Sequence, residues 1–214
     1  MNTVFQFPSL LLGTRNVGKV REIESILGDV PWRIRSLEEF EDIEVPAETG
    51  DTYADNAIIK AQFYARATGL CALADDSGLE VEALGGAPGV YSARYAGAGA
   101  SDADRRQLLL SELAAMPASQ RNARFVCVVA IALPEGAVLN KSEGTCNGKI
   151  IFEPRGTGGF GYDPLFVPDG FDKTFAELPD TIKNELSHRA RALLKTRDFL
   201  LSDHAQLDQP TGGS

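Results

Sequence analysis

Residues 10–20 read LLLGTRNVGKV, a short apolar run that leads through a glycine into a segment with helical periodicity. The apolar residues 10–12 predict a buried strand, and from Val20 to Leu27 apolar residues recur at the spacing of one helix face before Gly28 ends the pattern. The loop between them therefore lies at a helix N-terminus, where free backbone N–H groups and the helix dipole favour an anion. We expect this strand, loop and helix to bind phosphate.

The glycine and lysine spacing of this loop also fits the phosphate-binding loop of P-loop NTPases. That motif places a Ser or Thr after the lysine as a Mg²⁺ ligand, whereas here Val20 follows Lys19. Because valine offers a metal no ligand, we expect a nucleoside triphosphate to be bound by another design. Taken alone, the loop also fits a tight strand-to-helix turn with a solvated lysine.

The composition narrows the class of protein. The chain has 214 residues, of which 43% are hydrophobic and 24% charged, as in a globular enzyme of one domain. Its net charge of −9 argues against a broad attraction to nucleic acid or to an anionic membrane. Cys71, Cys127 and Cys146 have neither zinc nor disulfide spacing, and no apolar run approaches the roughly 20 residues of a membrane span. We therefore expect a cytoplasmic protein that binds neither nucleic acid nor membranes.

Two adjacent carboxylates follow the next helix and strand. A helix is predicted from a cap at Thr52 to Gly69, and the apolar run 70–74 predicts a buried strand that ends at Asp75 and Asp76. Adjacent acids repel each other, and a bound metal ion is a usual reason to tolerate them. The alternative is an Asx turn, in which the side chains bond only local N–H groups.

The rest of the chain predicts a mixed sheet. Alternation predicts a half-exposed strand over 79–84, a cap at Ser101 predicts a helix to about Ala115, and residues 124–133 and 137–146 predict a long hairpin. From residue 180 the pattern is helical. Helices and strands that alternate early and are followed by a hairpin indicate an α/β fold with a mixed rather than a purely parallel sheet.

A glycine-rich segment, residues 156–164, offers a place for a flat ligand. Phe160 and Tyr162 stand between glycines, so a ring could stack there while the backbone approaches closely. The alternative is a flexible loop. Two further candidates, Glu48 and the run Ser187-His188-Arg189, could equally be solvated surface groups.

Six short motifs follow one another along the chain. They are Thr14-x-Asn16-x-x-Lys19; Glu48-Thr49-Gly50 before Asn56-Ala57-x-x-Lys60-Ala61; Ala74-Asp75-Asp76-Ser77-Gly78-Leu79; Gly85-Gly86-Ala87-Pro88-Gly89-x-Tyr91-Ser92-Ala93-Arg94; Gly158-Gly159-Phe160-Gly161-Tyr162-Asp163-Pro164; and Ser187-His188-Arg189. Through these motifs the chain resembles the inosine/xanthosine triphosphate pyrophosphatase family, from about Leu11 to Leu201.

The resemblance implies a fold and an activity. The fold is an elongated mixed β-sheet flanked by helices, with two lobes and the active cleft between them, over residues 10–203. Residues 1–9 would be an N-terminal extension and 204–214 a disordered tail. The activity is Mg²⁺-dependent hydrolysis of dITP, ITP and XTP between the α and β phosphates, giving monophosphate and pyrophosphate and cleansing the nucleotide pool. The family also implies a homodimer.

The resemblance further implies roles for single residues. Asp76 would accept a proton from the attacking water, and Glu48 and Asp76 would bind Mg²⁺ with Asp75 nearby. The expected substrate-binding residues are Thr14, Arg15, Asn16, Val17, Gly18, Lys19, Lys60, Ser77, Phe160, Gly161, Tyr162, Asp163, Lys183, His188 and Arg189. Arg15 could contact a phosphate or point to solvent.

A physical hypothesis accounts for base selection. Donors on Lys183, His188 and Arg189 could meet the 6-oxo group of hypoxanthine or xanthine, whereas the 6-amino group of adenine would leave them unpaired. Each buried unpaired donor costs about 1–3 kcal/mol. Phe160 would stack on the base and Asp163 would read its edge.

Two rival functions remain open at this point. A P-loop NTPase or nucleotide kinase would release or transfer phosphate, and Val20 counts against it. A non-catalytic nucleotide-binding regulator would have no need of the acidic cluster.

Overall fold

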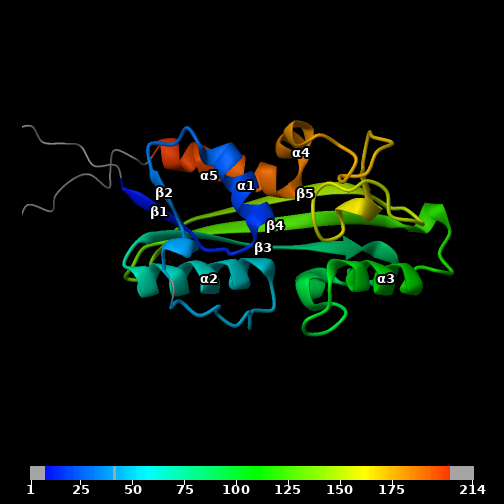
Figure 1. Cartoon of the computed structure of the whole chain (residues 1–214), viewed down its shortest axis with the longest axis horizontal. Coiled ribbons are helices and arrows are strands. Elements are labelled where there is room, and N and C mark those ends of the chain that lie inside the picture. The colour runs from blue at the N-terminus through cyan, green and yellow to red at the C-terminus, as the bar shows by residue number, and fades with distance from the viewer. Residues whose placement is uncertain (1–7, 41, 203–214) are drawn as a thin grey trace, which may run out of the picture.

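The computed structural model describes residues 8–40 and 42–202, and a six-stranded mixed sheet forms its centre (Figure 1). The strand order is β2-β1-β3-β4-β5-β6. The strands are β1 (Ser9–Leu12), β2 (Arg33–Ser36), β3 (Cys71–Val81), β4 (Asn122–Ala132), β5 (Val138–Ile150) and β6 (Phe166–Pro168). β1 runs parallel to β2 and β3, whereas β3, β4, β5 and β6 pair antiparallel, which confirms the predicted mixed α/β sheet and the long hairpin.

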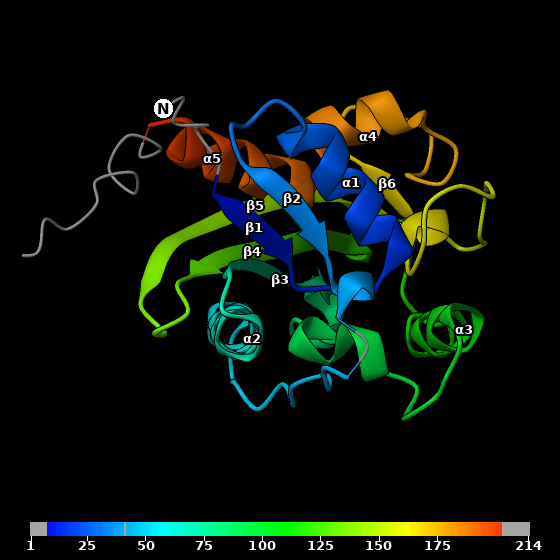
Figure 2. The same cartoon turned by 60° about the vertical axis from the view of Figure 1, so that its left-hand side comes forward.

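Helices cover both sides of the long strands, as Figures 1 and 2 show. α1 (Val17–Leu27), α4 (Asp180–Leu186) and α5 (His188–Ser202) lie on one side, and α2 (Tyr53–Thr68) and α3 (Asp102–Glu112) lie on the other. No helix among the residues described has the length and apolar character to cross a membrane.

Side-chain caps set the helix starts that the sequence predicts. Asn16 Oδ1 accepts a hydrogen bond from Lys19 N–H at 3.1 Å, which caps α1 directly after the loop. Thr52 caps α2 in the same way, and Ser101 forms a capping box with Asp104 at the start of α3. The predicted strand, loop and helix at the N-terminus are therefore confirmed, while α3 ends at Glu112, before the predicted Ala115.

The prediction that a strand ends at Ala74 is wrong. β3 runs without a break to Val81, so Asp75 and Asp76 lie in its middle, and the separate strand predicted over 79–84 is its end followed by a 3-10 turn. Backbone pairing with β4 continues through both acids, opposite Val129 and Val128. The apolar run stops because charged side chains begin, not because the strand does.

β3 extends well beyond its parallel neighbour. β1 pairs with β3 at Leu10–Leu12 and ends there, and Gly13 N–H then donates to Leu73 O at 2.7 Å as the chain turns into the loop. Beyond Ala74 this edge of β3 therefore borders the loop rather than a strand. The two acids lie along that edge, beside the helix N-terminus predicted to bind phosphate.

The prediction of one unbroken helix from Asp180 is also wrong, because the helix is interrupted at one residue. Ser187 is extended, with φ −67° and ψ 159°, and separates α4 from α5. Its hydroxyl accepts a hydrogen bond from Ala190 N–H at 3.1 Å and so caps α5. The break allows Lys183 on α4 and His188 and Arg189 on α5 to reach one cavity.

Two predicted end segments are described in part or not at all. Of the predicted extension 1–9, residues 8 and 9 are described, and Ser9 begins β1. The predicted tail, 204–214, lies outside the described residues.

Close packing of α5 on β5 gives a testable prediction. A Cβ at Gly144 would overlap His188 O and lie 2.5 Å from Ala192 N, which are backbone atoms that cannot rotate away. We expect Gly144→Ala to lower the free energy of unfolding by about 1–3 kcal/mol, measured by urea denaturation. Gly28→Ala is the matched control, because Gly28 has a helical φ of −64° and its Cβ would meet one backbone oxygen at 3.0 Å. Equal stabilities of the two variants would contradict this packing.

Candidate active site

One cavity lies where the loop, the free edge of β3, the glycine-rich segment and the helices α4 and α5 meet. Its lining brings together most of the residues that the sequence analysis singled out. It is lined by Asn16, Lys19, Glu48, Asp76, Ser77, Gly78, Leu79, Ser92, Ala93, Asp102, Arg105, Phe125, Phe160, Gly161, Tyr162, Asp163, Lys183, His188 and Arg189.

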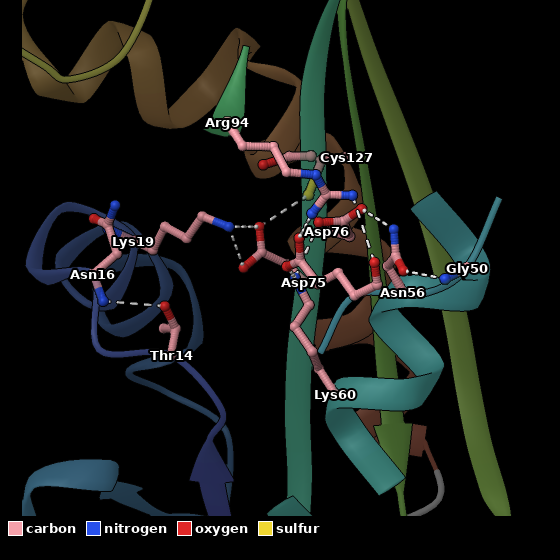
Figure 3. Close-up of polar contacts among 12 residues, drawn as sticks. Thr14, Asn16, Lys19, Gly50, Asn56, Lys60, Asp75, Asp76, Arg94 and Cys127 are labelled. Carbon is pink, nitrogen blue, oxygen red and sulfur yellow. Dashed lines mark hydrogen bonds and ion pairs between the residues drawn. The ribbon is translucent and has the colours of Figure 1, made fainter. Parts of the chain in front are cut away.

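Other predicted residues lie around the cavity rather than in its lining, as far as the described chain extends. Arg15 donates to Phe40 O at 3.4 Å and to Ile43 O at 3.1 Å, so its guanidinium binds the segment after β2. Val17 is 57% exposed, and Thr14 Oγ1 accepts a hydrogen bond from Asn16 N–H at 3.2 Å within the loop (Figure 3). A substrate role for these three residues stays a prediction.

Gly18 lies beneath the ring of Phe160. A Cβ at this position would be 2.6 Å from the Phe160 ring, so only glycine lets the ring lie this close to the start of α1. The packing brings the predicted stacking residue next to the loop predicted to bind phosphate.

The negative charge of Asp75 is balanced by two cations on the side of the sheet that carries α1 and α5. Its carboxylate is 3.0 Å from Lys19 Nζ and 3.3 Å from Arg189 Nε, and its side chain is 1% exposed. Burial alone would raise the pKa of Asp75, but the two cations hold that pKa well below its usual range. The Asp75 carboxylate therefore holds the charged ends of Lys19 and Arg189 at the cavity.

Asp76 meets a different cation because successive side chains of a strand point to opposite faces. Lys60 Nζ on α2 lies 3.0 Å from Asp76 Oδ1 (Figure 3). The same atom lies 2.6 Å from Glu48 Oε1. Asn56 Nδ2 donates to Asp76 Oδ2 at 3.3 Å, and its Oδ1 accepts from Gly50 N–H at 2.8 Å. The amide thereby joins the Glu48 loop to the carboxylate.

The electrostatics of Asp76 differ from those of its neighbour. Burial raises the pKa of Asp76; Lys60 lowers it in part, and the nearby Glu48 carboxylate raises it further, so the net shift is upward. A carboxylate with a raised pKa is a stronger base than an ordinary aspartate. Their surroundings thus shift the pKa values of the two adjacent acids in opposite directions.

Glu48 and Asp76 also fit a magnesium site. Both carboxylates already reach one positive centre, Lys60 Nζ, so they converge at the distances of direct contact. No group of three or more His, Cys, Asp or Glu side chains in the described part of the chain has the arrangement of a complete metal site. Mg²⁺ is usually bound by one or two carboxylates together with substrate phosphates, and this donor set matches that pattern.

Further ion pairs extend from Arg189 to α1 and α4, beside the Phe160 ring. Lys183 Nζ is 2.7 Å from Asp163 Oδ2 and 2.7 Å from Glu22 Oε1. Glu22 Oε2 in turn lies 2.5 Å from Arg189 Nη1. The Lys183 ammonium is 4.8 Å from the centroid of the Phe160 ring, so this aromatic face has cations beside it.

His188 lies buried at the start of α5, next to Arg189. It is 4% exposed and stacks on Phe125 with centroids 4.6 Å apart and planes at 11°. Its Nδ1 atom is buried and has no hydrogen-bond partner among the described residues. Burial, reinforced by the nearby Arg189 and Lys183 charges, holds the pKa of His188 well below 6.5, so its imidazole is neutral.

Sequence reasoning missed several residues that line the cavity or pair with its lining. Glu22 follows Lys19 by three positions on α1 and therefore lies on the same helix face, a spacing that could have revealed it. Phe125 and Asp102 gave no local signal, because β4 and α3 bring them to the cavity from distant parts of the sequence.

Comparison with known proteins shows which protein family this chain resembles in sequence and in structure. A sequence model described as the Ham1 family matches residues 10–199. A dITP/XTP pyrophosphatase of Geobacter sulfurreducens is 51% identical over 191 residues, which cover 89% of this chain and 96% of the relative. One from Thermus thermophilus is 48% identical over 184 residues, 86% of this chain and 87% of the relative. The structure of a HAM1 protein from Coxiella burnetii superposes with a TM-score of 0.81 at 44% identity, covering 92% of this chain and all of that one.

The buried His188 predicts a pH dependence of stability. Its folded pKa lies below the unfolded value near 6.5, so below that pH the unfolded chain binds a proton that the folded chain does not. The free energy of unfolding should therefore fall as the pH drops below about 6.5, by up to about 1.4 kcal/mol per pH unit from this residue. Urea denaturation at pH 7.5 and 5.5 measures it, and His188→Gln should show a smaller loss than the unaltered protein. An equal loss in both proteins would contradict the assignment.

Proposed function

The chain belongs to the Ham1 family, and on that premise we propose that it hydrolyses dITP, ITP and XTP to the nucleoside monophosphate and pyrophosphate. One observation carries the proposal beyond the family. A single cavity has a lysine-bearing helix N-terminus, a pair of convergent carboxylates, and an aromatic face flanked by cations. These parts suit the triphosphate, the reaction centre and the base in turn.

The charged residues at the loop end suit a triphosphate. Lys19 and the N-terminus of α1 would bind phosphate oxygens, and Lys60 would add charge next to the reacting group. Mg²⁺, held by Glu48 and Asp76, would supply further positive charge to the phosphate oxygens when bound.

Asp76 is proposed as the general base. Its carboxylate would take a proton from water, and the water oxygen would bond to the α phosphorus as the bond to the bridging oxygen breaks and pyrophosphate leaves. The upward shift of its pKa supports this role, because a more basic carboxylate accepts the proton more readily. Lys60, 3.0 Å away, would keep the carboxylate in place.

The part of the cavity beside the Phe160 ring supports a preference for 6-oxo purines. Lys183 and Arg189 are donors that Glu22 holds in position, and a 6-oxo group offers them an acceptor whereas a 6-amino group does not. The neutral His188 lines the same cavity. Asp163 already accepts from Lys183 and from Phe160 N–H at 2.9 Å, so we assign it to orient Lys183 and the ring.

The homodimer and the cytoplasmic location stay predictions. The three cysteines are buried and free of disulfides, which suits a reducing compartment.

A nucleotide panel tests the proposed activity. With Mg²⁺, we expect dITP, ITP and XTP to yield monophosphate and pyrophosphate, identified by ³¹P NMR. For ATP, kcat/KM should be at least about a hundredfold lower, because each buried donor left unpaired costs about 1–3 kcal/mol. Release of inorganic phosphate from ATP would instead favour an ordinary NTPase. Binding of all the nucleotides without turnover would favour a regulator.

Substitution of Asp76 tests the assigned base. Asp76→Asn keeps the size of the side chain but removes its charge, and we expect kcat for dITP to fall by about a hundredfold or more. Asp29→Asn is the matched control, because Asp29 is exposed and pairs with Arg197 on the surface. Turnover within a few-fold of the unaltered enzyme would rule out Asp76 as both base and essential metal ligand.

A further inference from the structure

The two peptide groups of Gly161 are bound by one helix, α3, to which the proposed function gives no role. Gly161 N–H donates to Asp102 Oδ2 at 2.7 Å, and Gly161 O accepts from Arg106 Nη1 at 2.7 Å. Both side chains come from the first turns of α3. We call this pair of contacts the Gly161 clamp.

The clamp acts on the residue next to the aromatic ring of the site. Gly161 has a φ of +60°, a left-handed conformation that glycine adopts readily and that leaves the segment free to take other shapes. Phe160 N–H donates to Asp163 Oδ2 at 2.9 Å, which fixes the peptide on the other side of the ring. Without the clamp, only one of the two peptides that flank Phe160 would be held by a side chain.

The anchor of the clamp is rigid. Ser101 and Asp104 form a capping box at the start of α3, and Leu109 and Leu113 are fully buried against the sheet. Burial would raise the pKa of Asp102, but hydrogen bonds from Arg105 and from Gly161 N–H lower it overall, so the acceptor is ionised. Hydrogen bonds to an ionised group are shorter and stronger than neutral ones.

The clamp also joins opposite sides of the molecule. In Figure 2 the yellow segment that contains residue 161 lies between α3 and α4. The Phe160 ring packs against Gly18 of the loop, with Lys183 of α4 beside it. The position of the ring thus depends on contacts from α3 as well as from α1 and α4.

We propose that Asp102 and Arg106 are positioning residues that hold Phe160 in place to stack on the purine base. The inference rests on the proposed function, because it assigns these residues to the base-binding end of that same site. Ordering the segment before the substrate arrives removes an entropic cost from binding. The clamp therefore acts on affinity for the base and leaves the reacting phosphate untouched.

Kinetics separate this role from a general structural one. In Arg106→Ala and Asp102→Ala we expect KM for dITP to rise about tenfold, the size of one charge-assisted hydrogen bond, with kcat within about twofold. The inhibition constant of inorganic tripolyphosphate, which has no base to stack, should change by less than about twofold in the same variants. Arg106→Lys keeps a donor and should restore most of the affinity. An unchanged KM, or an equal rise in the tripolyphosphate constant, would overturn the proposal.

Arg191→Ala is the matched control. Arg191 donates to the backbone Thr145 O at 2.8 Å, the same kind of contact as Arg106 makes, but it lies outside the cavity. This variant should keep both constants within about twofold of the unaltered enzyme. A tenfold rise in its KM for dITP would overturn the proposal, because loss of any such contact would then have the same effect.

Amide hydrogen exchange tests the clamp without any reliance on activity. Peptides that contain residues 158–163 should exchange faster in Arg106→Ala and Asp102→Ala, and at the original rate in Arg191→Ala. Unaltered exchange in the first two variants would overturn the clamp even where dITP is hydrolysed. If the two variants exchange faster but the unaltered protein does not hydrolyse dITP, the proposed function is rejected. The role of the clamp in base binding is then rejected with it.

Discussion

Two adjacent carboxylates in the middle of a buried strand impose the constraint on which the rest of the site depends. Burial of a charge is costly unless a partner of opposite charge accompanies it. Because Asp75 and Asp76 point to opposite faces of β3, they form direct ion pairs with different cations. Lys19 and Arg189 pair with the first, and Lys60 pairs with the second. Helices α1, α5 and α2 are thereby all joined to one short stretch of strand.

The same arrangement gives the two acids different chemistry. The pKa of Asp75 is lowered by the cations that surround it, whereas burial, reinforced by Glu48, keeps the pKa of Asp76 raised. Carboxylates whose surroundings separate their pKa values in this way can take separate roles. Asp75 suits a permanent anion that positions Lys19, and Asp76 suits a group that takes up a proton.

Sequence reasoning succeeded where the determining interactions were local. Caps at Thr52 and Ser101 bond to residues three positions away, so the sequence alone predicts them. It failed at the end of β3, because pairing with β4 across the sheet, rather than the apolar run, decides where that strand stops. The Gly161 clamp joins residues 55 and 59 positions apart, and nothing in either segment alone predicts that contact. Family motifs identified much of the cavity lining because they record such distant contacts indirectly.

The charge balance of the cavity gives a physical reason to expect a divalent cation with the substrate. Among the described residues, six side-chain cations in and around it are each paired with carboxylates, and those carboxylates also number six. The cations are Lys19, Lys60, Arg94, Arg105, Lys183 and Arg189, and the carboxylates are Glu22, Glu48, Asp75, Asp76, Asp102 and Asp163. Such a site holds its donors in fixed positions but has no net charge to attract a triphosphate, and the chain as a whole carries −9. Positive charge therefore has to arrive with the nucleotide, and Glu48 and Asp76 are the carboxylates that converge where it would be held.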